Sequence, residues 1–230
     1  MINLTELISI IIPVLNEENN IEGILQQVNR LVGNKEVIVV DGGSSDDTVN
    51  IAQRKADKVI ISKKGRGQQL NKGVEYANGD ILFFLHSDCT LKKDALLSIN
   101  DVLKNKDVIG GCFRLKLDGR GLFYKYITWS SNLRARYLKL IFGDQGIFVR
   151  KDVFNEIKGF PNKPIMEDWD FSKKLSKHKG ELVFLDDEIV SSVRKFEKNG
   201  KWKTFLLMQW IKILYTFGVK AEKIYEMYYN

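Results

Sequence analysis

The chain has 230 residues, of which 44% are hydrophobic and 28% are charged, and its 36 basic and 29 acidic residues leave a net charge of +7. This length allows one α/β domain with a substantial core, and the composition excludes both a disordered chain and a multi-span membrane protein. The positive charge favours an anionic partner, such as a nucleic acid, a phosphorylated small molecule or an acidic lipid headgroup.

The cysteine content and the apolar runs indicate in which cellular compartment the protein is expected. Cys89 and Cys112 are too few and too far apart for a disulfide framework or a zinc site, which predicts buried thiols in a reducing compartment. The first apolar run follows no basic segment and is interrupted by Pro13, unlike a signal peptide. The apolar stretch 205–219 contains Lys212 and is shorter than the roughly 20 residues of a membrane span. We therefore expect a cytoplasmic protein without a transmembrane helix.

The first half of the chain alternates between apolar runs and helical patterns. Apolar or β-branched runs predict strands at 8–14, 36–41, 58–62, 80–85 and 108–117, and apolar residues at helical spacing predict helices at 21–28, 48–56, 68–77 and 93–104. Strands that are apolar on both faces and alternate with helices are typical of a parallel, doubly wound sheet. We therefore predict an α/β fold with a mostly parallel central sheet.

The pattern changes at Gly119, where a long aromatic and basic stretch begins that runs to Phe142. Later patterns predict a strand at 145–150, a helix with an acidic start at 166–179, a short strand at 181–185 and an aromatic helical segment at 202–229. Because the chain contains neither a repeat nor a proline-rich linker, we predict a single domain over residues 1–230.

Acidic side chains follow three of the predicted strands, at Glu17, Asp41 and Asp88. In open α/β sheets, ligands bind beyond the carboxyl ends of the strands. Carboxylates beside a diphosphate would repel it unless they bound hydroxyls, base N–H groups or a cation. Glu17 and Asp41 are suited to accept hydrogen bonds from ribose hydroxyls or a pyrimidine N–H, and Asp88 is suited to hold Mg²⁺ or Mn²⁺. The alternative is that each carboxylate caps a helix.

Four motifs stand in a fixed order along the chain, at 10–17, 39–48, 65–71 and 166–168. In this order they resemble the inverting family 2 glycosyltransferases of GT-A fold, and the resemblance covers nearly all of the first 195 residues. With the segment 143–146, they are most similar to a small bacterial subgroup. The resemblance implies a nucleotide-binding part at about 1–117, followed by an acceptor-side part with C-terminal helices at about 118–230.

The resemblance also implies roles for individual residues in donor binding. The nucleotide pocket would be formed by Pro13, Leu15, Glu17, Asp41, Gly42, Arg66, Gly67 and Ser87. Asp88 would take the last position of the family's Asp-x-Asp metal motif and bind Mn²⁺ or Mg²⁺. His86 departs from that motif because it occupies the first acidic position, and either a contact to ribose or phosphate or a buried place at the strand end suits it.

An acidic pair opens the helix predicted at 166–179. By the family pattern, Asp168 would be the base that takes the acceptor proton, a role that typically contributes about 10²- to 10⁴-fold to the rate. Glu167 would orient that base or bind an acceptor hydroxyl. The alternative is that the two acids only stabilise the helix dipole.

Three further polar residues are candidates for substrate binding. Asp144 and Gln145 lie between two glycines and either bind the donor sugar or acceptor or simply form a turn. Arg194 follows the last predicted strand, and its guanidinium is suited to the oxygens of a diphosphate. The expected donor is a UDP-sugar.

Two segments, 120–142 and 194–223, mix aromatic with basic residues. Such segments suit an anionic membrane surface and a lipid-linked acceptor, which would place the protein peripherally at the inner face of a membrane. The alternative is that the aromatic residues pack on the sheet while the lysines remain solvated.

Two other functions fit parts of the sequence. A sugar nucleotidyltransferase should carry a glycine-rich basic loop directly after the first strand, where this chain has Asn16, Glu17 and Glu18. A nucleic-acid-binding module would explain the basic charge but would leave the acidic residues unused, and those acids would oppose a phosphate backbone. We therefore expect no nucleic-acid partner.

Overall fold

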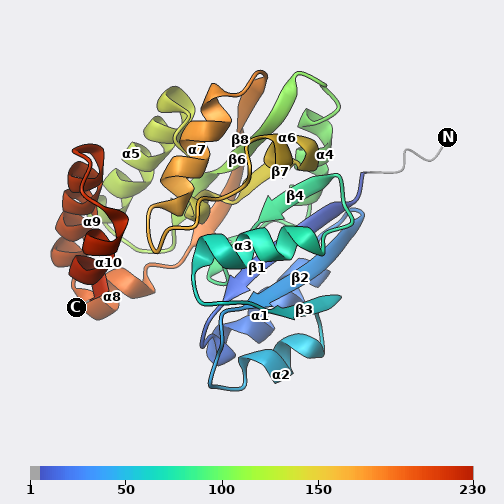
Figure 1. Ribbon diagram of the computed structural model, residues 1–230, viewed down its shortest axis with the longest axis horizontal. Helices are drawn as coiled ribbons and strands as arrows, with labels where there is room; N and C mark the ends of the chain where they lie inside the picture. The colour runs from blue at the N-terminus through green and yellow to red at the C-terminus, as the bar shows by residue number, and fades with distance from the viewer. Residues whose placement is uncertain (1–5, 230) are drawn as a thin grey trace.

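The computed structural model describes residues 6–229, which contain one eight-stranded sheet flanked by helices (Figure 1). The strands are β1 (Ile8–Val14), β2 (Lys35–Asp41), β3 (Lys58–Ile61), β4 (Ile81–Phe84), β5 (Cys89–Leu91), β6 (Val108–Leu117), β7 (Ile147–Arg150) and β8 (Glu181–Ser191). The helices are α1 (Glu18–Asn29), α2 (Thr48–Gln53), α3 (Arg66–Glu75), α4 (Ala95–Val102), α5 (Leu122–Leu138), α6 (Lys151–Glu156), α7 (Glu167–Lys177), α8 (Arg194–Asn199), α9 (Lys201–Thr216) and α10 (Ala221–Tyr229), with a short 3₁₀ turn at Gly143–Gln145.

The strands lie in the order β3-β2-β1-β4-β7-β6-β8-β5. The first four are parallel, and β6 is parallel to β8, whereas β7 runs antiparallel to both of its neighbours and β5 runs antiparallel to β8. The prediction of a mostly parallel α/β sheet is therefore confirmed. Antiparallel β7 joins the half of the sheet that contains β1 to the half that contains β6.

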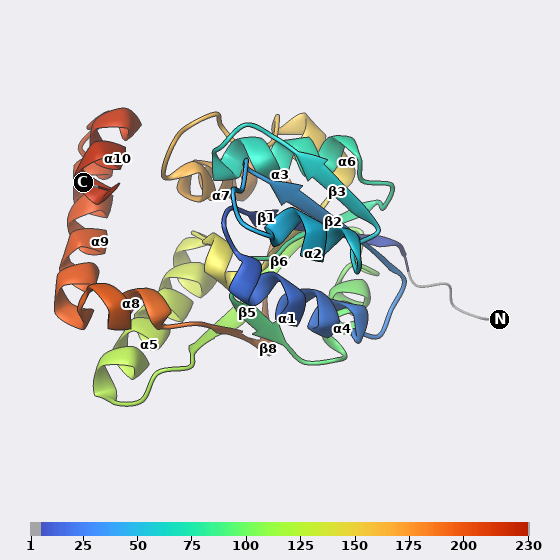
Figure 2. The same ribbon diagram turned by 90° about the horizontal axis from the view of Figure 1, so that it is seen from below.

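The central strand β1 is buried on both faces, because its side chains alternate between two apolar clusters. Ile10 and Ile12 pack with α1 and α4 on one face, and Ile11 packs with α3 on the other. All three isoleucines are fully buried. Fully burying such a side chain contributes about 1.5 to 3 kcal/mol. Figure 2 shows α1, α2 and α4 on one side of the sheet and α3, α6 and α7 on the other.

The structure differs from the sequence-based expectations mainly in short or interrupted elements. β5, α6 and α8 were not expected, and β8 is twice as long as the short strand predicted at 181–185. The helical segment predicted at 202–229 divides at Gly218, whose φ of 84° favours glycine and ends α9. Two helices with different directions therefore replace one.

The aromatic and basic stretch after Gly119 forms α5, which packs against β6 and the C-terminal segment. Tyr124 is buried in a cluster with Leu115, Val193 and Phe196. Both cysteines are buried and free, as predicted. Among residues 6–229, no helix combines the length and apolar character needed to cross a membrane.

The contact between α3 and the sheet leaves no space for an extra methyl group at Gly73. A Cβ there would lie 2.5 Å from Cγ2 of Ile11 and 3.0 Å from Cγ2 of Val40. We expect Gly73→Ala to lower the free energy of unfolding by about 1 to 3 kcal/mol through overpacking, measured by urea denaturation. Gly23 is the matched control, because it lies in α1 with no atom within 4 Å of its Cβ position. Gly23→Ala should stabilise the chain by about 0.5 to 1 kcal/mol, and equal effects of both changes would contradict this packing.

Candidate active site

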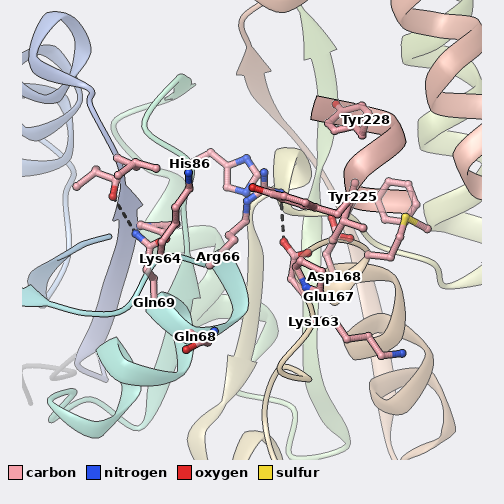
Figure 3. Close-up of a pocket in the computed structure, with 18 of the residues that line it drawn as sticks. Lys64, Arg66, Gln68, Gln69, His86, Lys163, Glu167, Asp168, Tyr225 and Tyr228 are labelled. Atoms are coloured by element: carbon pink, nitrogen blue, oxygen red, sulfur yellow. Dashed lines mark hydrogen bonds and ion pairs between the residues drawn. The ribbon is translucent and has the colours of Figure 1, made fainter. Parts of the chain in front are cut away.

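A cavity of about 830 Å³ opens between the carboxyl ends of β1 and β4, the start of α7 and the C-terminal helices. Figure 3 shows Lys64, Gln69 and His86 on one side of it and Tyr225 and Tyr228 of α10 on the other. The predicted site residues that line it are Pro13, Leu15, Glu17, Arg66, Ser87, Asp88, Glu167 and Asp168. The predicted residues outside its lining are Asp41, Gly42, Gly67, Asp144, Gln145 and Arg194.

The loops that follow β1 and β2 hold each other through hydrogen bonds. Asn16 has a φ of 53°, a conformation that asparagine tolerates, and its side-chain oxygen accepts the Ser45 N–H at 2.9 Å. The Ser44 hydroxyl accepts the Asn16 N–H, and the Thr48 hydroxyl accepts the Glu17 N–H, both at 2.8 Å. These contacts fix the backbone that presents Glu17 to the cavity.

Asp41 lies beneath this loop pair and is only 1% exposed. Its carboxylate accepts the N–H groups of Gly43 and Ser44, each at 2.8 Å, and the Ser44 hydroxyl. In this structure the carboxylate therefore shapes the turn after β2, and its contact to a nucleotide stays a prediction.

Gln69 of α3 connects the ends of β1 and β2. Its side-chain amide donates to the carbonyls of Val14 and Val40, each at 2.8 Å, and the residue is buried. Gly42 packs against this amide, because a Cβ at Gly42 would lie 3.1 Å from it. The same helix begins at Arg66, so this anchoring sets the position of the Arg66 guanidinium at the cavity.

Arg66 meets Glu167 across the cavity (Figure 3), with 3.3 Å between Nη1 and Oε1. The Glu167 side chain is only 4% exposed. Burial raises the pKa of Glu167 to about 7, although the Arg66 charge opposes that rise. Gly67 allows this approach of α3 and α7, because a Cβ there would lie 2.9 Å from the Pro161 carbonyl oxygen.

Asp168, the second residue of α7, is half-buried and held by two backbone groups. One carboxylate oxygen accepts the Trp169 N–H at 2.8 Å, and the other accepts the Gly143 N–H at 3.2 Å. The carboxylate is therefore oriented at the cavity wall by the start of its own helix and by the turn before β7.

Asp88 is half-buried and faces the cavity near Glu17. Burial raises the pKa of Asp88, and the nearby charge of Glu17 adds to the rise. Arg194 lies outside the lining, with its Nη2 atom 3.6 Å from Oε2 of Glu17. A cation between Asp88 and a phosphate would relieve the unfavourable burial of the carboxylate, and carboxylate oxygens are ligands that Mg²⁺ and Mn²⁺ accept.

The residues present fit such a cation, but only as a partial ligand set. No group of three or more His, Cys, Asp or Glu side chains between residues 6 and 229 has metal-binding geometry. Mg²⁺ is commonly held by one or two carboxylates together with substrate phosphates, which is the arrangement that Asp88 allows.

His86 packs against the turn at Gly143 instead of pairing with an acid. A Cβ at Gly143 would lie 2.3 Å from Nε2 of His86, so the imidazole fills the space that the glycine leaves. Burial lowers the pKa of His86 to about 3, and the ring is therefore neutral at physiological pH. It lines the cavity beside Asp88.

Asp144 and Gln145 lie behind the cavity wall, next to Arg134 of α5. The Arg134 guanidinium donates to Gln145 Oε1 at 3.0 Å and to the Leu140 carbonyl at 3.1 Å. Burial raises the pKa of Asp144, whose Oδ1 atom has no hydrogen-bond partner among the described residues. Both predicted residues therefore belong to a buried polar cluster in this structure.

The C-terminal helices supply cavity residues that the sequence analysis did not single out. They are Met208, Ile211 and Lys212 of α9 and Tyr225 and Tyr228 of α10. Lys212 could have been identified from the sequence, because a charged residue inside the apolar stretch 205–219 must reach either solvent or a polar cavity. No motif marked the other four.

The raised pKa of Glu167 predicts a pH-dependent stability difference. Glu167 has an ordinary pKa of 4.5 and a folded-state pKa of about 7, so the folded chain binds the extra proton between these values. Its favourable contribution is complete below pH 4.5 and is lost as the pH rises through 7. Glu167→Gln should therefore gain stability relative to the unsubstituted chain between pH 5 and pH 8, measured by urea denaturation. A difference that does not change with pH would contradict the buried state of this carboxyl.

Comparison with known proteins places the chain in a family. The model of glycosyl transferase family 2 matches residues 9–157, more than half of the chain. An uncharacterized glycosyltransferase of Haemophilus influenzae is 28% identical over 97% of this chain and 93% of its own length. Glycosyltransferase AglE of Haloferax volcanii is 28% identical over 79% of this chain, and the match spans 65% of AglE.

Solved structures share the fold. The mannosyltransferase PcManGT from Pyrobaculum calidifontis, in complex with GDP-Man and Mn²⁺, has a TM-score of 0.68 and 18% identity over 96% of this chain and 67% of its own. S. aureus TarS 1-349 in complex with UDP-GlcNAc has a TM-score of 0.64 and 21% identity over 81% of this chain and 58% of its own. The GT-A fold expected from the motifs is therefore confirmed. The chain belongs to glycosyl transferase family 2 and is a glycosyltransferase.

Proposed function

We propose that this glycosyltransferase moves a sugar from a nucleoside diphosphate sugar, with a UDP-sugar as the favoured donor, to an acceptor hydroxyl with inversion at the anomeric carbon. The observation that carries the proposal is that one cavity brings together the strand-end residues, Asp88 and the acidic pair at the start of α7. Donors of this class are supported by the UDP-GlcNAc and GDP-Man complexes of the structural neighbours.

The donor would lie along the ends of β1 and β4. Pro13 and Leu15 line the wall beside Glu17, where a nucleoside would rest, and Glu17 would accept hydrogen bonds from its hydroxyls. Arg66 begins α3, so its guanidinium and the helix N-terminus would both face the diphosphate. Asp41 and Gly42 would act from beneath, by shaping the loop after β2.

Asp88 would hold Mn²⁺ or Mg²⁺ together with the donor's diphosphate. When bound, the cation would stabilise the negative charge that develops on the leaving diphosphate. Ser87 lies beside Asp88 on the cavity wall, and neutral His86 would contact the same end of the donor without adding charge.

Asp168 would act as the base. The acceptor oxygen attacks the anomeric carbon opposite the diphosphate, the bond from that carbon to the diphosphate breaks, and the acceptor proton passes to the Asp168 carboxylate. The hydrogen bonds from Gly143 and Trp169 hold the carboxylate in one orientation for this transfer. Glu167 would position the acceptor side through its pairing with Arg66.

Donor binding and proton transfer should separate in two variants. A panel of UDP-, GDP- and dTDP-sugars with Mn²⁺ should show calorimetric binding and slow donor hydrolysis, with the UDP-sugars bound most tightly. Asp88→Asn should weaken metal-dependent donor binding by about tenfold or more, because it removes a charged ligand. Asp168→Asn should bind the donor normally and lose about 10²- to 10⁴-fold in hydrolysis.

Asp101→Asn is the matched control, because Asp101 is an exposed carboxylate on α4. It should leave donor binding and hydrolysis unchanged. Absence of binding by every sugar nucleotide in the presence of metal would overturn the proposed function, and full hydrolysis by Asp168→Asn would remove the proposed base.

We also propose that the protein binds a membrane surface peripherally, on the basis of two exposed apolar stripes. Exposed residues follow one face of each helix, at Leu122, Tyr126, Trp129, Leu133 and Tyr137 of α5 and at Trp202, Leu206, Trp210 and Ile213 of α9, with Phe217 directly after α9. The helices touch, because the rings of Phe123 and Trp202 lie 4.8 Å apart. Neither helix contains an acidic residue. Apolar and basic surfaces of this kind fit the inner face of an anionic membrane and suit a lipid-linked acceptor.

Vesicle sedimentation tests this surface. The protein should sediment with vesicles that contain phosphatidylglycerol, less so at high salt, because charge attraction supports the apolar contact. A Trp210→Ser, Phe217→Ser double variant should bind about tenfold more weakly, since both side chains would leave the lipid interface. Ile61→Ser removes an exposed apolar residue from β3 and is the control. Absence of sedimentation at low and high salt would remove the membrane contact.

A further inference from the structure

We propose that Lys212 binds an anionic group, a phosphate or a carboxylate, of the acceptor. This inference rests on the proposed function and adds the chemical class of the acceptor. Lys212 is the charged residue on the wall that the C-terminal helices contribute to the cavity, where its neighbours are Met208, Ile211, Tyr225 and Tyr228.

Lys212 differs from the other half-buried cations near the cavity in its lack of a close partner. The Arg134 guanidinium donates to Gln145 and Leu140, and the Lys163 ammonium lies 2.6 Å from an oxygen of Asp170. The Lys212 ammonium, by contrast, forms no hydrogen bond or ion pair with the side chains described between residues 6 and 228, and it lies 5.4 Å from the centre of the Phe142 ring. An ammonium that is partly removed from water without a hydrogen-bonding partner is unfavourable, and an anion bound in the cavity would compensate for that cost.

The charged groups around Lys212 do not fully compensate for its burial. Burial lowers the pKa of Lys212 to about 8, and the charge of Arg134 lowers it further. The charges of Asp144 and Asp168 favour the ammonium, but neither carboxylate forms an ion pair with it. At neutral pH the side chain is still mainly charged, and an anion would find a cation that is already partly desolvated.

The location of Lys212 points to the acceptor instead of the donor. The charges that act on Asp88, where the diphosphate would lie, are those of Glu17, Arg194 and Arg66. The acidic groups whose charges act on Lys212 are instead Asp144 and Asp168, and Asp168 is the proposed base. A molecule whose anion rests on Lys212 would thus lie beside the carboxylate that must receive its hydroxyl proton. The apolar and aromatic neighbours would cover the rest of that molecule.

Calorimetry on the UDP-bound protein tests the inference. UDP with Mg²⁺ would first occupy the diphosphate site, and glycerol 3-phosphate would then probe the remaining cavity, with glycerol as the uncharged comparison. We expect glycerol 3-phosphate to bind and glycerol not to bind. Lys212→Met should weaken glycerol 3-phosphate by about tenfold or more and leave UDP affinity unchanged, whereas Lys212→Arg should retain both. Lys203→Met, an exposed lysine of the same helix, is the matched control and should behave like the unsubstituted protein.

The source of the anion is distinguished by a second probe, a short-chain phosphatidic acid below its micelle concentration. Tighter binding of this lipid than of glycerol 3-phosphate, with the same loss in Lys212→Met, supports the inference with a lipid headgroup as the source. Equal binding supports it with a soluble phosphate. Unchanged probe affinity in Lys212→Met, or a loss of UDP affinity in that variant, would overturn the inference. Failure of UDP itself to bind any variant would refute the proposed function, and the acceptor assignment with it.

Discussion

The buried amide of Gln69 connects the elements on the side of the cavity where we propose that the donor binds. Gln69 donates to the carbonyls at the ends of β1 and β2, and buried carbonyls of that kind need a donor. The amide thereby fixes α3 against two strands whose isoleucines and valines fill the core. The position of α3 in turn fixes Arg66 at its start. It also fixes the loop at Phe160, because Asn71 of α3 exchanges two hydrogen bonds with the backbone of Phe160. The acidic start of α7 comes directly after that loop.

The strand ends could be predicted because their signals are local. Continuous apolar runs identify β1, β2 and β4, and the polar residues that follow them must lie at one edge of a parallel sheet. The cavity therefore contains Glu17 and Asp88 as expected. Local signals did not reveal that the Asp41 carboxylate would be occupied by its own turn, because that depends on hydrogen-bond geometry. The antiparallel direction of β7 could not be predicted either, because a four-residue apolar run has the same sequence pattern in a parallel and an antiparallel strand.

The side of the cavity where we propose that the acceptor binds was harder to predict, because it is assembled from residues far apart in the chain. Phe142, Asp168 and Lys212 come from a loop, α7 and α9, and no spacing rule links them. The aromatic residues of α5 and α9 were expected either to pack inward or to face a membrane, and the structure shows that some of these side chains are buried and others exposed. Tyr124 of α5 is buried, whereas Trp129 of α5 and Trp210 of α9 are exposed. Helical periodicity separates these faces only after the orientation of each helix is known.

The break at Gly218 divides the C-terminal segment into two helices, and residues of both line the cavity. Ile211 of α9 and Tyr228 of α10 line the cavity and belong to a small cluster with Met166, separate from the two large clusters that enclose β1. Substitutions at these two positions would alter the wall of the cavity opposite the strand ends without changing the two clusters that enclose β1. In evolutionary terms, if this wall holds the acceptor as we propose, acceptor preference can change through residues 201–228 while the strand ends stay constant.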